Sequence, residues 1–233
     1  MTAPGALPAW LRPLAEAGAE ADLRGLPRAP RDGSGRSSAV LVLFGEGPSG
    51  PDVLLIERAA TLNSHAGQPA FPGGTIDPGD DGPVGAALRE AEEETGLDPP
   101  GVDVLAVLPE LFVSRTRFRV TPVLAWWREP CAVGPVDPGE VAAVARVPLA
   151  ELADPENRLW VRHPTNPRNG YRSVAFSVRG MVVWGFTAGL LDKLLQLTGF
   201  ARPWNTERVE ALPSAKAGLI DREIDRERQA RGG

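Results

Sequence analysis

A sharply bounded helix that carries a cluster of carboxylates is the feature that most constrains this sequence. Pro83 suits the first helical position, and Gly96 suits the left-handed conformation that follows a last helical turn. Pro99 and Pro100 then prevent the helix from continuing. The pattern predicts a short helix that must dock one of its faces on a core, and hence a fold in which other elements supply that core.

The predicted helix has one apolar stripe and one acidic arc. At about 100° per residue, the residues that share the stripe are Val84, Leu88, Ala91 and Thr95. The residues that share an arc of roughly 100° on the other side are Glu90, Glu93 and Glu94, with Glu92 outside it. We expect the face of Val84 and Leu88 to pack on the core, so that three carboxylates face one site.

These carboxylates lie at the end of the helix where negative charge is least favourable. The helix dipole disfavours each anion there by a few tenths to about 1 kcal/mol, and Glu90 repels Glu94 at i, i+4. Arg89 can offset one charge by pairing with Glu93. The remaining charge favours a bound cation, and hard oxygen ligands suit Mg²⁺ or Mn²⁺. The alternative is a solvated acidic helix face.

Two glycines, Gly73 and Gly74, precede this helix and allow backbone groups to approach a phosphate or a metal. Together with the helix they resemble the Nudix hydrolase signature, Gly-x5-Glu-x7-Arg-Glu-U-x-Glu-Glu-x-Gly-U, in which U is apolar. The matching residues are Gly74, Arg89, Glu90, Ala91, Glu93, Glu94, Gly96 and Leu97. Fourteen residues separate Gly74 from Arg89 where the signature has thirteen, and Asp80 or Asp81 stands in for the first glutamate.

A loop that is longer by one residue is typical of one Nudix branch, the coenzyme A pyrophosphatases. That branch carries an upstream pattern, Leu-Leu-x-x-Arg-Ser/Ala-x3-Arg-x3-Gly-x3-Phe-Pro-Gly-Gly, which this sequence resembles. The matching residues are Leu54, Leu55, Arg58, Ala59, Gly67, Phe71, Pro72, Gly73 and Gly74. Asn63 stands where the branch usually has its second arginine, a natural partner for phosphate. The resemblance covers roughly residues 38–197.

The resemblance implies an α/β/α sandwich around a mixed β-sheet, whereas composition and periodicity alone reach only α/β or α+β. Strands are predicted at 38–45, 53–58, 102–108, 118–126 and 142–147, with a hairpin from 159–163 and 172–178. Helical segments are predicted at 8–17, 149–153 and 183–197. The expected domains are an N-terminal helix and linker at 1–37, a Nudix hydrolase domain at 38–204 and a charged C-terminal tail at 205–233.

The same resemblance implies metal-dependent attack of water on a pyrophosphate bridge. It implies that Glu90 and Glu94 are metal ligands. Glu93 is expected to share the metal through its carboxylate or a water, and Gly74 to add its carbonyl. Arg89 is expected to orient Glu93 and so to support the site.

Further candidate residues lie outside the helix. Glu140, in the segment Pro138-Gly139-Glu140, is a candidate general base or additional ligand, and an exposed loop carboxylate is the alternative. The candidate substrate contacts flank the glycines and are Arg58, Asn63, His65 and Gln68. Three tryptophans either stack on a base or pack in the core, namely Trp126, Trp127 and Trp184.

Three functions are open at this point. The first is hydrolysis of coenzyme A or its derivatives to 3′,5′-ADP and 4′-phosphopantetheine or its acyl form. The second is hydrolysis of another nucleoside diphosphate compound such as ADP-ribose, which Asn63 favours. The third is a Nudix-fold binding module without turnover. The joint presence of Arg89, Glu90, Glu93 and Glu94 argues against the third, because a binding domain does not need so unfavourable a charge cluster.

Composition agrees with an intracellular enzyme. The net charge of −5 gives no basic patch, so we expect a small-molecule substrate and no nucleic-acid polymer. The single cysteine, Cys131, excludes an internal disulfide and fits the reducing cytoplasm. We see no secretory signal, and the most apolar stretch, 181–191, is too short to span a bilayer. No membrane partner is expected, and a homodimer is left open.

Overall fold

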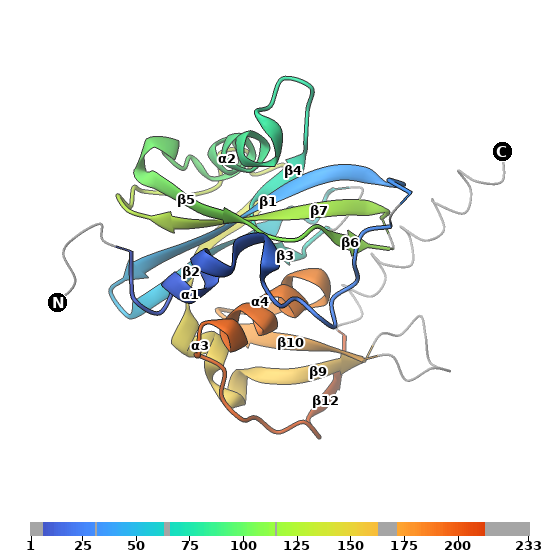
Figure 1. The fold of residues 1–233 in the computed structure, drawn as a ribbon. Helices are drawn as coiled ribbons and strands as arrows, with labels where there is room; N and C mark the ends of the chain where they lie inside the picture. The colour runs from blue at the N-terminus through green and yellow to red at the C-terminus, as the bar shows by residue number, and fades with distance from the viewer. Residues whose placement is uncertain (1–6, 31, 63–65, 115, 163–171, 213–233) are drawn as a thin grey trace.

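The computed structural model describes residues 7–30, 32–62, 66–114, 116–162 and 172–212 (Figure 1). In these ranges the larger of two sheets has eight strands. They are β1 (Arg36–Gly47), β2 (Gly50–Arg58), β3 (Pro69–Ala70), β4 (Gly73–Thr75), β5 (Val102–Val107), β6 (Leu111–Val113), β7 (Phe118–Trp127) and β8 (Val141–Pro148). The order is β3-β2-β1-β7-β5, and β4 also pairs with β1, β6 with β7 and β8 with β2.

The predicted mixed sheet is confirmed. Strands β1 and β7 run parallel, from the pair Arg36 and Phe118 to the pair Phe44 and Trp126. The other pairs in this sheet are antiparallel. The predicted strands at 38–45, 53–58, 102–108, 118–126 and 142–147 correspond to β1, β2, β5, β7 and β8.

Helices cover both faces of this sheet. The α-helices are α1 (Arg12–Ala17), α2 (Gly82–Thr95), α3 (Leu149–Ala153) and α4 (Gly185–Leu197), and the 3₁₀ helices are η1 (Gly18–Glu20), η2 (Pro99–Gly101) and η3 (Pro155–Asn157). Helix α2 lies on one face, and α1 and α4 lie on the other (Figure 1). None of the described helices is both long enough and apolar enough to cross a membrane.

Apolar side chains on both sides of β1 explain why both faces of the sheet are covered. Leu41 and Leu43 belong to a buried cluster with α2, whereas Val42 and Phe44 belong to a larger buried cluster with α1 and α4. Successive side chains of a strand point to opposite faces, so a strand that is apolar at every position needs a layer on each side. The predicted α/β/α arrangement follows from this pattern.

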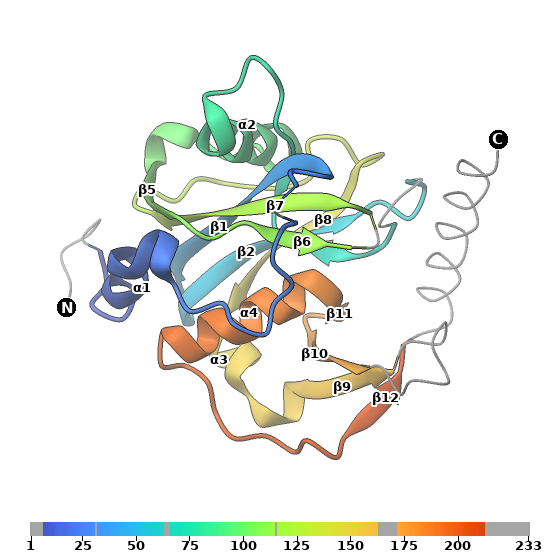
Figure 2. The same ribbon diagram turned by 45° about the vertical axis from the view of Figure 1, so that its right-hand side comes forward.

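A second sheet lies beyond α4, so that α4 is packed between two sheets (Figure 2). Its strands are β9 (Arg158–Arg162), β10 (Arg172–Val178), β11 (Met181–Val183) and β12 (Val209–Ala211), in the order β11-β10-β9-β12. The predicted hairpin is confirmed, because β9 and β10 pair antiparallel. Strand β12 comes from the segment predicted as a charged tail and runs parallel to β9. Residues 213–233 lie outside the described ranges.

Two predicted helices begin later than the sequence indicates. The helix predicted at 8–17 starts at Arg12, because residues 8–11 form a turn in which Leu11 N–H donates to the Pro8 carbonyl at 3.1 Å. The helix predicted at 183–197 starts at Gly185, because Val183 pairs with Phe176 in the second sheet. Apolar periodicity does not separate the end of a short buried strand from the start of a buried helix.

Candidate active site at the glycine turn and helix α2

Strand β4 brings two glycines against helix α2. Gly73 pairs with Val40 and Gly74 with Ala39. Gly73 has a φ of +155°, and a Cβ there would lie 2.7 Å from the Val40 Cα atom. A Cβ at Gly74 would overlap the carboxylate of Glu90. Only glycine therefore fits at position 73, whereas a side chain at position 74 would displace the Glu90 carboxylate.

Glu94 is the most deeply buried carboxylate of the cluster, and its side chain is 5% exposed. Its Oε2 atom accepts a hydrogen bond from Gly73 N–H at 3.0 Å, and Oε1 lies 3.3 Å from Arg58 Nη1. Burial raises the pKa of Glu94 to about 7; the hydrogen bond from Gly73 and the charge of Arg58 oppose this increase. The charges of Glu90 and Glu140 raise the pKa further. Additional positive charge here would stabilise the carboxylate form.

Glu90 is half-buried beside Gly74. Burial raises the pKa of Glu90 above its ordinary value, and the hydrogen bond from Arg89 opposes this. The Nη1 group of Arg89 donates to Glu90 Oε1 at 3.1 Å and to Glu93 Oε2 at 3.0 Å. One guanidinium nitrogen therefore lies between two carboxylates of the cluster, and the i, i+4 contact with Glu93 is present.

Arg89 is fixed from its other side by Asp80. Its Nε and Nη2 groups donate to the two oxygens of Asp80 at 2.8 and 3.0 Å, and Nη2 also donates to the Thr75 carbonyl at 3.1 Å. These hydrogen bonds raise the pKa of Arg89 and lower that of Asp80. Asp77 N–H donates to Asp80 Oδ2 at 2.7 Å. The structure thus pairs Asp80 with Arg89, while Asp81 precedes the first turn of α2.

The predicted stripe of α2 packs on the core, but the buried surface of the helix is wider than the stripe. Ala91 and Thr95 of the stripe are fully buried, and Val84 and Leu88 are partly buried against the same cluster. The buried surface also includes Ala86, Ala87 and Glu94. Glu94 lies on the buried side, Glu90 is half-buried and Glu93 is exposed. The packing of the predicted stripe is confirmed, whereas the prediction that all three carboxylates lie away from the core is wrong for Glu94. Small alanine side chains beside Glu94 add to the buried surface without covering the space that its carboxylate occupies.

Glu140 and Gln68 approach Arg58 from two neighbouring segments. The Glu140 side chain is exposed, but its carbonyl accepts a hydrogen bond from Ala59 N–H at 2.8 Å. The Gln68 carbonyl accepts from Arg58 N–H at 3.1 Å. The structure therefore places the backbones of Glu140 and Gln68 beside the Arg58 segment of β2. The Arg58 side chain in turn contacts Glu94 on helix α2.

The remaining predicted residues either lie outside the described ranges or are buried, wholly or in part, elsewhere. Asn63 and His65 lie outside the described ranges. Trp126 and Trp127 are buried in the core and do not form a stacking surface. Trp184 is half-buried against a small cluster on the second sheet.

The donors at this site fit a hard divalent cation. They are the carboxylates of Glu90, Glu93 and Glu94 beside a glycine whose missing side chain leaves room for a carboxylate. In the part of the chain that the structure describes, no three of these groups converge on one point, and each contacts an arginine. A cation would replace these arginine contacts, and oxygen donors of this kind suit Mg²⁺ or Mn²⁺.

Sequence reasoning missed two contributions to the site. Neither the pairing of Arg89 with Asp80 nor the hydrogen bond from Gly73 to Glu94 was predicted. The adjacent aspartates at 80 and 81 were a signal for the first, since one of them stands in for the glutamate of the signature. The second depends on the distance between a strand and a helix and leaves no pattern in the sequence.

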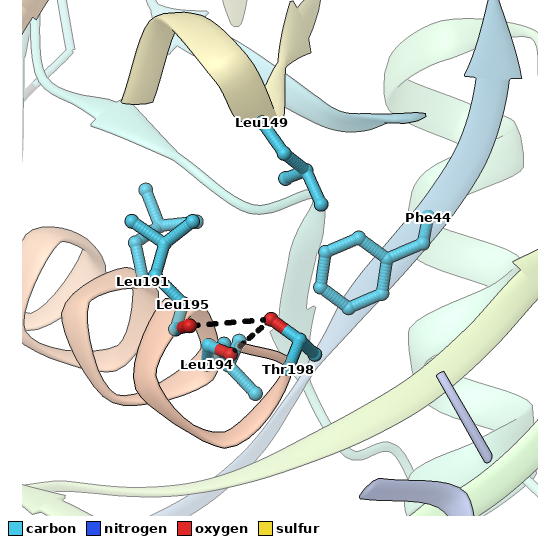
Figure 3. Close-up of a pocket in the computed structure, with 6 residues that line it drawn as sticks. All are labelled: Phe44, Leu149, Leu191, Leu194, Leu195 and Thr198. Carbon is cyan, nitrogen blue, oxygen red and sulfur yellow. Dashed lines mark hydrogen bonds between the residues drawn. The ribbon is translucent and has the colours of Figure 1, made fainter. Parts of the chain in front are cut away.

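An apolar recess lies on the opposite face of the large sheet (Figure 3). It is lined by Phe44, Leu149, Leu191, Leu194, Leu195 and Thr198. The Thr198 hydroxyl donates to the Leu194 carbonyl at 2.6 Å, so the single polar side chain of this lining is satisfied within α4. The recess offers no group for acid–base or metal chemistry and is not the candidate site.

Comparison with known proteins agrees with the geometry. A model of the NUDIX domain matches residues 35–166. The chain is 43% identical over 170 residues to a protein described as the uncharacterized Nudix hydrolase NudL of Cronobacter sakazakii, and the match covers 68% of this chain and 81% of that protein. A Klebsiella pneumoniae protein with the same description is 40% identical over 179 residues, which cover 72% of this chain and 85% of that protein.

A solved structure supports the fold. The crystal structure of the M. smegmatis Nudix hydrolase RenU matches with a TM-score of 0.50 and 22% identity, and the match covers 78% of this chain and 99% of that one. The domain match and the identity to the NudL proteins, together with the carboxylates around the glycine turn, lead to one conclusion. The chain belongs to the Nudix hydrolase family.

Proposed function

We propose that this Nudix hydrolase cleaves the pyrophosphate bond of coenzyme A or one of its derivatives, giving 3′,5′-ADP and 4′-phosphopantetheine or its acyl form. Family membership supports the reaction class, hydrolysis of a phosphoric anhydride bond in a small molecule. Two sequence features support coenzyme A as the substrate. They are the upstream pattern that includes Arg58 and Gly67, and the loop between Gly74 and Arg89 that is longer by one residue.

The structural observation that best supports metal-dependent hydrolysis is the environment of Glu94. A carboxylate that is 5% exposed, with Glu90 and Glu93 near it on the same helix, is unfavourable unless positive charge is bound nearby. Glu90 and Glu94 are the proposed metal ligands, Glu93 shares the metal, and the Gly74 carbonyl completes the oxygen donors. When bound, Mg²⁺ or Mn²⁺ supplies positive charge that stabilises the negative charge developing on the pyrophosphate.

The chain's own residues position the reacting groups. Arg89, held by Asp80, fixes the orientation of Glu90 and Glu93. Gly73 fixes Glu94 through its backbone N–H. These contacts restrict the carboxylates to a few orientations, which is the condition for effective electrostatic catalysis.

A base must assist deprotonation of the attacking water. Glu140 is the proposed general base, because its side chain is exposed and its charge acts on Glu94. Glu93 is the other exposed carboxylate of the site, so it is the alternative base. A comparison of Glu140→Gln with Glu93→Gln tests the assignment, since loss of a general base lowers turnover typically by 10²–10⁴-fold.

A second substrate is favoured by one residue. Asn63 replaces the arginine that coenzyme A pyrophosphatases usually carry, so a nucleoside diphosphate compound that lacks the 3′-phosphate, such as ADP-ribose, is the alternative. A panel of coenzyme A, its 3′-dephospho form and ADP-ribose, with identification of the products and with and without metal, decides between them. Preference for ADP-ribose over coenzyme A would contradict the proposed substrate.

Asn63→Arg adds a second test of the same question. If position 63 lies near the 3′-phosphate, the substitution lowers KM for coenzyme A and leaves KM for the dephospho form unchanged. An equal improvement for both compounds would indicate contact with the pyrophosphate instead. No improvement for either would mean that residue 63 lies outside the substrate path or that the enzyme recognises a different nucleoside diphosphate compound.

A further inference from the structure

The two arginines of the site are held very differently. Arg89 donates to Asp80, Glu90, Glu93 and the Thr75 carbonyl in five hydrogen bonds of 2.8–3.1 Å. Arg58 contacts Glu94 through one nitrogen at 3.3 Å. Charge-assisted hydrogen bonds usually measure about 2.7–2.9 Å, so the contact between Arg58 and Glu94 is long. Arg89 is clamped, whereas Arg58 is loosely held.

The backbone of Arg58 is well anchored, so only its side chain is free to move. Its N–H donates to the Gln68 carbonyl at 3.1 Å, and its carbonyl accepts from Gly67 N–H at 3.0 Å. The pairing of β2 with β8 shifts its register between Glu57 and Arg58. The Arg58 side chain is 27% exposed, compared with 5% for Glu94. The guanidinium thus lies between the buried carboxylate and solvent.

Part of the Arg58 guanidinium has no hydrogen-bond partner in the ranges that the structure describes. Its Nε atom is buried without a hydrogen-bond partner there. An arginine whose side chain makes one weak ion pair within the described ranges, to Glu94, has donors left for a second partner, since a guanidinium carries five N–H groups. At this position the complementary partner is an anion such as a phosphate.

We propose that Arg58 is a displaceable counter-ion, which neutralises Glu94 while no cation is bound, yields this carboxylate to the cation, and then binds a phosphate of the substrate. This inference rests on the proposed function, because it takes Glu94 as a metal ligand. It changes the sequence prediction for Arg58, which assigned it to the substrate alone. A single residue then links occupation of the metal site to binding of the substrate.

Removal of Arg58 distinguishes this role from structural support of Glu94. A counter-ion competes with the cation, so its loss strengthens cation binding. A residue that only holds Glu94 in place would weaken cation binding when removed. The two roles therefore predict changes of opposite sign, and damage to the fold does not produce the first.

The experiment measures binding of Mn²⁺ alone to the full-length protein by electron paramagnetic resonance of free Mn²⁺. A pH of about 8.5 limits competition from protons. For Arg58→Gln we expect Mn²⁺ to bind about three- to tenfold more tightly than in the wild type, the effect of removing one positive charge near a divalent ion in a largely hydrated site. In the same variant we expect KM for the best substrate of the panel to rise about tenfold or more, from the loss of a phosphate contact.

Arg119→Gln is the matched control. Arg119 has a similarly exposed side chain, 25%, and pairs with Glu110 outside the carboxylate cluster. We expect its Mn²⁺ affinity and KM to match those of the wild type. Unchanged or weaker Mn²⁺ binding in folded Arg58→Gln overturns the inference but leaves the proposed function intact. Absence of Mn²⁺ binding in the wild type overturns the metal site and the inference together.

Nuclear magnetic resonance of the arginine Nε–H groups tests the inference if Arg58→Gln does not fold. Arg58→Lys, which retains the positive charge, identifies the Arg58 signal by its loss from the spectrum. On addition of Mg²⁺ to the wild type we expect this signal to shift, while the Arg119 signal stays in place. An Arg58 signal unaffected by saturating Mg²⁺ would contradict displacement.

Discussion

The Nε and Nη2 groups of Arg89 lie 2.8 and 3.0 Å from the two carboxylate oxygens of Asp80. This pair joins the loop after the glycine turn to the helix that carries the acidic cluster. Asp80 touches none of the proposed metal ligands through these bonds, but it fixes the arginine that contacts Glu90 and Glu93. The longer loop and the shorter acidic side chain therefore still complete the support of the site.

Asp80→Asn tests this support. The amide keeps the shape of the side chain but loses its charge and offers only one acceptor oxygen to the guanidinium. We expect kcat to fall about 10- to 100-fold, as is typical when a group that orients metal ligands is removed. Asp81→Asn, one residue further on, is the control and should retain activity. Equal effects of the two substitutions in steady-state kinetics would argue against a specific role of Asp80.

Glu94→Gln tests the buried carboxylate. Glutamine has the same shape and can still accept the hydrogen bond from Gly73, so we expect the fold to be retained. Turnover should fall by about 10²-fold or more because a preorganised charge is lost. Glu92→Gln on the exposed side of the same helix should leave kcat unchanged. Near-normal turnover of folded Glu94→Gln would remove Glu94 from the site.

Gly74→Ala tests the space beside Glu90. The added Cβ overlaps the Glu90 carboxylate, so this side chain must move. We expect at least a tenfold loss of kcat and a loss of unfolding free energy of about 1–3 kcal/mol, the usual range for overpacking. Gly79→Ala is the matched control, because no atom lies within 4 Å of its added Cβ. Wild-type kinetics in Gly74→Ala would show that Glu90 needs no such space.

Metal removal tests the cofactor. A chelator should abolish turnover, and added Mg²⁺ or Mn²⁺ should restore it. Added metal should also raise the Tm of the wild type, because a ligand that binds only the folded state stabilises it, and this increase should shrink in Glu94→Gln. Hydrolysis that persists in excess chelator, with metal content verified by elemental analysis, would contradict a metal-dependent mechanism.

Local patterns in the sequence predict the elements of this fold well. Pro83 and Gly96 mark the ends of α2, and Gly96 adopts the expected left-handed conformation with φ of +70°. Periodicity alone reaches only α/β or α+β, and it is the resemblance to Nudix hydrolases that predicts the sheet covered on both faces, as the two buried clusters on either side of β1 confirm. Strand β12 leaves no such signal, because its three residues are partly buried or exposed and it is held by pairing with β9.

The orientation of α2 shows why the candidate site is predicted only in part. Larger side chains dominate an apolar pattern, so the predicted stripe centres on Val84 and Leu88, whereas in the structure the buried surface also takes in Ala86 and Ala87. An alanine adds little to a hydrophobic pattern, yet its small volume decides how near two backbones can come. The contact of Arg58 with Glu94 joins residues that are 36 positions apart, which no local periodicity can indicate.

The parallel pairing of β1 with β7 affects how the site forms during folding. Ser38 at the start of β1 lies opposite Val120, and the whole segment with the glycine turn and α2 lies between these two strands in the chain. Their pairing closes a long loop, and this closure carries an entropic cost. The proposed base Glu140 follows β7 in the chain, so a nascent chain that ends before β7 lacks part of the proposed site.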